Sequence, residues 1–211
     1  VPLDRDMALR LSVLDNQSDG WIRDAANGRH YGKDDEWGAR AVWRWNVTPD
    51  TRVLLSWDHD RLRQPSRIDV GLVPLSRDVQ QRPPFPAQPA GYVNPLHAPV
   101  FNDAGDGREA RNYNAGTLTI DHSFAWGSLV STTNWTGYGM SHVEDGDGTD
   151  HVPSHLDTGV FGKGRTWYQE FKLSGSNDAA DWVSGLSYYQ EHASQTNLAR
   201  LNTDSVDTLA L

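Results

Sequence analysis

Apolar and polar residues alternate along residues 36–47. Trp37, Trp43 and Trp45 occupy odd-numbered positions, whereas Arg40 and Arg44 occupy even-numbered positions. Because successive side chains of a β-strand point to opposite faces, this alternation predicts a strand with one apolar face. Six further segments have strand character, rich in Val, Thr, Trp and Tyr and separated by Gly, Pro, Asn and Asp. The seven predicted strands are residues 4–15, 36–47, 51–62, 113–124, 128–142, 166–176 and 181–193.

The connections between these segments alternate between short and long. The tight turns are residues 48–50, 125–127 and 177–180, and the long, Gly-rich, polar connections are residues 20–35, 63–112 and 143–165. This order predicts an antiparallel up-and-down sheet with short turns at one end and long loops at the other. Bacterial outer-membrane barrels have this asymmetry. A soluble sandwich has less reason to keep its long loops at one end, although antibody-like folds do so.

A three-residue turn at 48–50 fixes the expected pairing of the two strands beside it. Val47 then faces Thr51, and Arg40 pairs with Asp58 on the opposite, charged face. Opposite charges directly across a strand pair stabilise it by roughly 0.2 to 1 kcal/mol relative to alanines. Segment 113–124 repeats the separation into two faces. In segments 128–142 and 181–193 apolar residues occupy both odd- and even-numbered positions. The sequence therefore does not determine which side of these two strands is the apolar face.

The overall composition is polar but rich in large aromatics. Only 37% of residues are hydrophobic and the mean hydropathy is -0.65, yet the chain has nine Trp and seven Tyr. A net charge of -9 disfavours nucleic-acid binding, which requires a basic face. The absence of cysteine excludes disulfides and thiolate metal sites. No run of about 18 apolar residues predicts a spanning helix. The chain opens with Val1-Pro2 and no leader pattern, so we expect an internal piece of a longer protein.

The apolar face of the predicted strands could be a soluble core or could meet lipid. Tryptophans stand beside the predicted short turns, as Trp45, Trp126 and Trp182 do, and beside the long loops, as Trp37 and Trp167 do. Two aromatic girdles of this kind flank the apolar band of a membrane barrel. We therefore favour the membrane and expect the charged face to line a hydrated lumen. The expected lumen-facing residues are Arg40, Arg44, Asp58, Asp60 and Asp121.

Three stretches resemble the barrel region of TonB-dependent outer-membrane receptors. VPLDRDMALRLSVLDNQSDGWIRD is similar to the family's Pro-Leu strand followed by an Asp-Gly-aromatic entry to a loop. GARAVWRWNVTPDTRVLLSWDHD resembles its tight Thr-Pro-Asp hairpin. TWYQEFKLSGSNDAADWVSGLSYYQEHAS resembles its later hairpin, with a Glu-x-Lys-Leu-Ser strand and a Trp-Val-x-Gly-Leu-x-Tyr-Tyr strand. The resemblance spans nearly the whole chain and identifies the family rather than the ligand.

The resemblance implies a large closed barrel occluded by an N-terminal plug. Such receptors import scarce nutrients, most often ferric siderophores, with energy delivered by the TonB complex. We therefore expect an all-β, antiparallel, up-and-down transmembrane β-barrel fragment of about seven strands in the bacterial outer membrane. Residues 1–211 would be part of one barrel domain, with the plug and both barrel ends outside the chain. The expected partners are TonB, a siderophore or similar small nutrient, and outer-membrane lipid, with no cofactor and no nucleic acid.

Two other functions share part of this pattern. A passive porin has the same strands, and an upstream plug domain of about 100 to 150 residues would distinguish a receptor from it. A soluble all-β module that binds carbohydrate with exposed tryptophans is the third possibility. No Ser/His/Asp set, spaced carboxylate pair or phosphate-binding glycine loop is present, so we do not expect an enzyme.

The long loops contain the candidate ligand and metal residues. Residues 144–150 resemble a calcium loop, but Leu156 stands where the twelfth-position Glu would be, which favours a solvated loop tip. His151 and His155 have a metal-like spacing, but Pro153 forbids the helix that would align them. We expect no metal site. Residues 82–99 hold six prolines and predict a stiff extended loop. The candidate ligand contacts there and just beyond are Phe85, Tyr92, His97 and Phe101.

Overall fold

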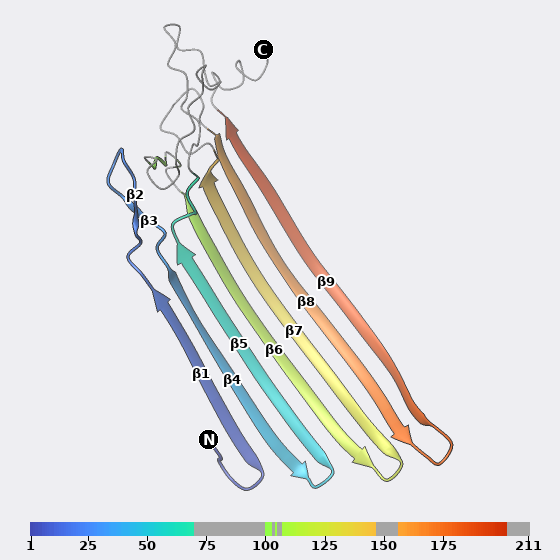
Figure 1. The fold of residues 1–211 in the computed structure, drawn as a ribbon. Coiled ribbons are helices and arrows are strands. Elements are labelled where there is room, and N and C mark those ends of the chain that lie inside the picture. The colour runs from blue at the N-terminus through green and yellow to red at the C-terminus, as the bar shows by residue number, and fades with distance from the viewer. Residues whose placement is uncertain (70–99, 103, 105–106, 147–155, 202–211) are drawn as a thin grey trace, which may run out of the picture.

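Most of the described part of the chain forms one seven-stranded antiparallel sheet (Figure 1). The computed structural model describes residues 1–69, 100–102, 104, 107–146 and 156–201. In these ranges, seven strands pair in the order β1-β4-β5-β6-β7-β8-β9, each antiparallel to its neighbour. The all-β class and the up-and-down order are therefore confirmed. The strands are β1 (Met7–Gln17), β4 (Asp35–Thr48), β5 (Thr51–Gln64), β6 (Arg108–Phe124), β7 (Gly127–Asp145), β8 (Leu156–Ser176) and β9 (Asp181–Leu201).

Short turns join the strands at one end of the sheet (Figure 1). Phe124 pairs with Gly127, so two residues make the β6–β7 turn. The β8–β9 turn is closed by Asn177, whose Oδ1 accepts hydrogen bonds from the backbone nitrogens of Ala179 and Ala180, each at 2.9 Å. An Asn side chain that satisfies the backbone in this way favours a turn. The predicted short-turn end is confirmed at all three positions.

The β4–β5 turn differs from the expected one by a single residue. Thr48, not Val47, pairs with Thr51, and the register shifts between Asn46 and Thr48. Val47 is thus the extra residue of a β-bulge. Because the bulge absorbs this shift, the pairing beyond it, including Arg40 with Asp58, is as predicted.

Several strands are longer than the sequence pattern indicated. β8 begins at Leu156 rather than at residue 166, and β9 continues to Leu201 rather than to 193. β6 begins at Arg108 rather than at 113, while β1 lies at Met7–Gln17 rather than at 4–15. Glycines disfavour strands locally, but an unbroken ladder of backbone pairs between β8 and β9 outweighs that preference.

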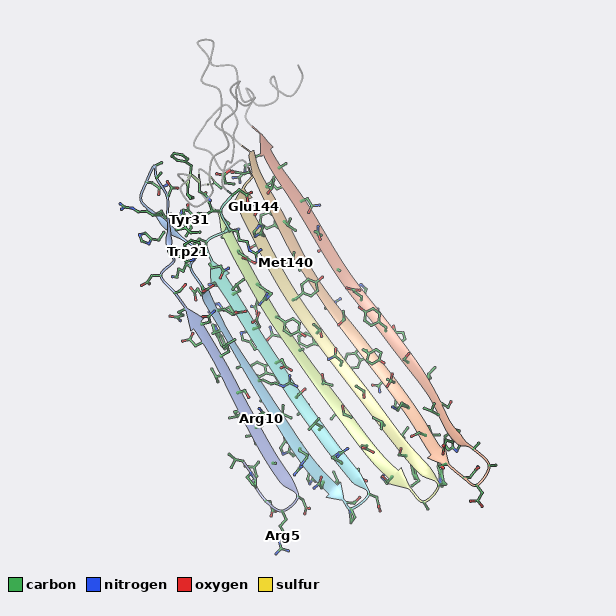
Figure 2. All side chains as sticks on the ribbon, viewed as in Figure 1. Arg5, Arg10, Trp21, Tyr31, Met140 and Glu144 are labelled. Carbon is green, nitrogen blue, oxygen red and sulfur yellow. The ribbon has the colours of Figure 1, made fainter. Side chains whose placement is uncertain are left out.

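A small hairpin stands within the predicted loop at residues 20–35. It consists of β2 (Ile22–Arg23) and β3 (His30–Tyr31), and Figure 2 shows Trp21 and Tyr31 there. The buried Asp24 carboxylate holds it in place, since its Oδ2 accepts from the Asn102 backbone nitrogen at 3.1 Å. Tyr31 is only 1% exposed, and its burial raises the pKa of its phenol.

The sheet is a single layer over most of its length. The chain has an accessible surface of 14191 Å², whereas a compact monomer of 23.5 kDa exposes about 9,800 Å². Buried apolar side chains in the described ranges gather at the end opposite the short turns, and include Tyr31, Leu62, Ala104 and Val143. Towards the short turns, both faces of the described sheet carry exposed large side chains (Figure 2).

Candidate functional site

The strand register assigns every described strand residue to one of two faces. Directly paired residues of antiparallel strands share a face. Trp43 pairs with Leu55 of β5 and with Leu9 of β1, and Leu55 pairs in turn with Leu118 of β6, so these four residues share one face. We call this side the apolar face. Its large side chains include Met7, Leu9, Leu11, Val13, Trp37, Trp43, Trp45, Val53, Leu55, Trp57, Leu118, Ile120, Phe124, Leu129, Trp135, Trp167, Phe171, Leu173, Trp182, Leu186 and Tyr188.

Aromatic residues bound the apolar face in two rows. The upper aromatic row, nearer the long connections, is Trp37, Trp57, Trp135, Trp167 and Tyr188, whose exposed fractions run from 37% to 56%. The lower aromatic row, at the short turns, is Trp45, Phe124, Trp126 and Trp182. The rings of Phe124 and Trp126 stack at 5.0 Å, and those of Trp126 and Trp182 at 6.2 Å. Aliphatic residues occupy much of the space between the rows.

The two aromatic rows are six to eight residues apart along the strands. Trp37 and Trp45 are eight residues apart on β4. The β6 partner of Trp57 and Trp135 is Gly116, eight residues from Phe124. On β9, Trp182 is six residues from Tyr188 and eight from Gln190, the partner of Trp167. Eight residues of strand span about 26 Å, so the apolar face has a similar height on three separate hairpins.

Polar side chains between the two rows satisfy one another. Thr133 Oγ1 donates a hydrogen bond to Gln169 Oε1 at 2.5 Å. Gln169 Nε2 donates in turn to Ser131 Oγ at 3.1 Å. This mutual bonding lowers the cost of placing three polar groups on the apolar face, because an unpaired polar group is expensive in an apolar medium.

The opposite, polar face carries ion pairs between neighbouring strands. Arg40 lies 3.3 Å from Asp58, and Arg52 lies 2.8 Å from Asp121. All five residues expected to face the lumen share this side, which is what the register requires. Arg44 forms no ion pair within the described residues.

The sequence interpretation missed the largest charge cluster of the polar face. Arg111 binds two carboxylates from two other strands, Asp60 at 2.7 Å and Glu36 at 2.8 Å. Its position falls outside the predicted strand 113–124, and β6 reaches it only because it begins earlier. Alternation continued two residues back from Tyr113 would have placed Arg111 on this side.

The structure also decides the faces of the strands that the sequence left open. Tyr138 and Met140 of β7 lie on the polar face, since they pair with Gly164 and Gly162 of β8. A Cβ at Gly164 would contact the Tyr138 ring, so the ring covers this glycine. On the same face Tyr168 donates a hydrogen bond to Glu170 at 2.6 Å. The large aromatics here are tyrosines, of which Tyr168 and Tyr189 donate to glutamates, whereas those of the apolar face are mostly tryptophans.

Exchanging the charges of Arg40 and Asp58 should be tolerated. The pair is partly exposed, 59% and 31%, so each single substitution, Arg40→Asp or Asp58→Arg, is expected to cost no more than about 1 kcal/mol. The double variant should recover most of that loss, because the opposite charges again face one another. Urea unfolding of the four proteins measures the coupling. Additive losses in the double variant would contradict the pairing.

The candidate ligand and metal residues fall largely outside the described ranges. Phe85, Tyr92 and His97 lie outside them, as do His151, His155 and residues 147–150 of the acidic run. Phe101 is described and half-buried, next to Val100, whose carbonyl accepts from the Ala25 backbone nitrogen at 2.8 Å. Among described residues, no group of three His, Cys, Asp or Glu is arranged to hold a metal.

Comparison with protein-family models, curated proteins and solved structures finds no match to this chain. Within the described ranges, no helix has the length and apolar character needed to cross a membrane.

Proposed function

We propose that this sheet is part of a closed β-barrel that spans a bacterial outer membrane. The single observation that carries the proposal is the pair of aromatic rows, exposed or half-buried and up to eight residues apart on three hairpins. Strands tilted by 35 to 45° convert a separation of about 26 Å into roughly 20 Å across the bilayer, and with the rings included this approaches the apolar band of about 25 Å in such barrels. The polar face then lines an aqueous interior, where ion pairs such as Arg40–Asp58 stay hydrated.

A soluble module is less compatible with the same surface. Soluble sheets bury their apolar face against a second layer. Monomeric soluble proteins rarely expose apolar patches above a few hundred Å². Here four large side chains on three strands, those of Leu55, Trp57, Trp135 and Phe171, are each 44% to 46% exposed. A carbohydrate binder would need a few of these tryptophans, but not an aliphatic band between two aromatic rows.

We further infer active uptake of a scarce small nutrient, such as a ferric siderophore, by a TonB-dependent receptor. The resemblance of three stretches to that family supports this step. Further strands would pair with the outer edges of β1, beyond the stretch Met7–Leu9 that residues 1–3 already bond, and of β9, since a bilayer does not tolerate unpaired edges. These strands would close the barrel. Partners would be the TonB complex, the nutrient and outer-membrane lipid. A passive porin would share this wall but would need no energy source.

Energised uptake tests the proposal in cells that carry the intact protein. We expect the protein to remain with the membranes until detergent is added, and radiolabelled ferric siderophore to accumulate in a manner that requires TonB. Deleting TonB should reduce accumulation to the level of cells lacking the protein. Accumulation that continues without TonB, together with sugar permeation through reconstituted vesicles, would instead identify a porin. Release from the cells without detergent would contradict the membrane location.

A further inference from the structure

Three cations lie together on the apolar side of the sheet, just beyond the upper aromatic row. One row of directly paired residues crosses the sheet from β5 to β8 and consists of Arg61, Asn112, Gly139 and Lys163. Arg165 occupies the next row, two residues from Trp167 and opposite Gly137. We call this group the cationic patch. Its cations are Arg61, Lys163 and Arg165, and its floor, the strand surface between them, is formed by Asn112, Gly137 and Gly139. No sequence segment contains it, since it is assembled from four strands.

The cations of the patch are free of carboxylate partners. Within the described residues, none of the three forms an ion pair, whereas Arg40, Arg52 and Arg111 on the polar face are all paired. Alternation places the acidic residues of β5 to β9 on the polar face, except Asp145 and Asp157, which are buried near the strand ends. Asp15 of β1 is on the apolar side in the row of Arg61, two strands and about 10 Å of backbone away. Asp145 is six residues from Gly139, about 20 Å along the strand. The patch is therefore a local excess of positive charge on a chain of net charge -9.

The floor of the patch leaves room for a ligand. The open part is at Gly139, where an added Cβ would meet no atom within 4 Å, whereas one at Gly137 would meet the Trp135 ring. Arg61 and Lys163 stand three strands apart, about 14 Å between their backbones, and long side chains can reach inward from both. Lys163, Arg165 and Asn112 are exposed, and the Asn112 amide can add a neutral donor.

This arrangement suits phosphate oxygens at the level of lipid headgroups. Arginine binds phosphate through its planar set of donors, and lysine adds a compact charge. Trp57, Trp135 and Trp167 mark the boundary of the apolar face, and the cations follow directly beyond it. Aromatic residues at a bilayer surface lie at headgroup depth, and basic residues there attract anionic lipid. We propose that the cationic patch binds the phosphate groups of an anionic lipid at the long-loop end of the barrel. The proposal rests on the membrane-spanning function proposed above.

Lipid selectivity of the intact protein tests this site. The protein is reconstituted in phosphatidylcholine vesicles that contain spin-labelled phosphatidic acid or spin-labelled phosphatidylcholine. The test variant is Arg61→Gln/Lys163→Gln/Arg165→Gln. The control, Arg10→Gln/Arg44→Gln/Lys172→Gln, removes the same charge from the polar face. Each cation near the surface contributes roughly a fivefold preference for anionic lipid. We expect the wild type and the control to prefer phosphatidic acid by at least about fivefold, and the test variant to lose most of that preference.

The possible outcomes distinguish failure of the lipid site from failure of the membrane-spanning proposal on which it rests. Insertion of all three proteins, with equal preference for phosphatidic acid in wild type and test variant, would overturn the lipid site alone. Failure of every protein to insert into either vesicle would overturn the membrane-spanning proposal and the lipid site with it. Displacement of the labelled lipid by millimolar inorganic phosphate would show a site for free anions and contradict a headgroup site.

Discussion

Replacing Leu55 with arginine is expected to lower the free energy of unfolding in lipid vesicles by about 2 to 4 kcal/mol. Leu55 lies between the two aromatic rows, paired with Trp43 and Leu118. If this face meets lipid, the guanidinium must enter the hydrocarbon near its midplane, where its desolvation is expensive. Urea unfolding from vesicles, followed by tryptophan fluorescence, measures the loss.

The neighbouring Leu54 supplies a matched control. The two leucines are similarly exposed, 39% for Leu54 and 45% for Leu55, but they point to opposite faces. Leu54→Arg faces the polar side, where its only expected cost is repulsion from the paired Arg44, up to about 1 kcal/mol. If both faces met water, each substitution would change stability by only about 0.5 kcal/mol, as at ordinary surface positions. Equal, small effects would therefore show that the apolar face does not meet lipid.

Replacing Gly127 with alanine is expected to destabilise the protein by about 1 to 3 kcal/mol. Gly127 is the first residue of β7, directly after the turn that contains Trp126. A Cβ there would collide with the backbone carbonyl oxygen of Ser174 on β8. A flexible side chain could move aside, but a backbone held in the β7–β8 ladder cannot do so without breaking pairs. The loss should appear as a lower midpoint in urea.

Gly116→Ala is the control for this substitution. Gly116 lies in the middle of β6, and a Cβ there would meet no atom within 4 Å. Alanine should therefore stabilise the strand by about 0.4 to 1 kcal/mol, because it restricts the unfolded chain. A Gly127 variant as stable as the Gly116 variant would mean that β7 and β8 are not as close at this turn as the structure indicates.

The β4–β5 hairpin was predictable because two local signals agree there. Alternation from Trp37 to Trp45 and the turn residues around Pro49 each specify one register, and the structure has that register beyond the bulge. The five charged residues of the candidate site follow from this hairpin and from the alternation around Asp121. The bulge at Val47 was not predictable, since it changes the number of turn residues but not the faces of the strands.

Long strands and distant contacts were not predictable from local preference. Residues 156–165 contain three glycines and read as loop, yet they are strand because β7 and β9 flank them on both sides. The β2–β3 hairpin depends on Asp24 meeting Asn102, 78 residues away in the chain. The cationic patch likewise depends on the registers between β5, β6, β7 and β8. Alternation within one segment does not determine how that segment is aligned with its neighbours.

Four features follow from local sequence signals: the all-β class, the antiparallel order, the short-turn end and the two faces of β4 and β5. Period-two alternation and turn chemistry are local, so they need no knowledge of partners. Contacts between distant segments set the ends of the strands, the direction in which the residues of β7 and β9 face, and the charges that meet across strands. Those features depend on register between segments, and a shift of one residue would have turned every side chain to the other side.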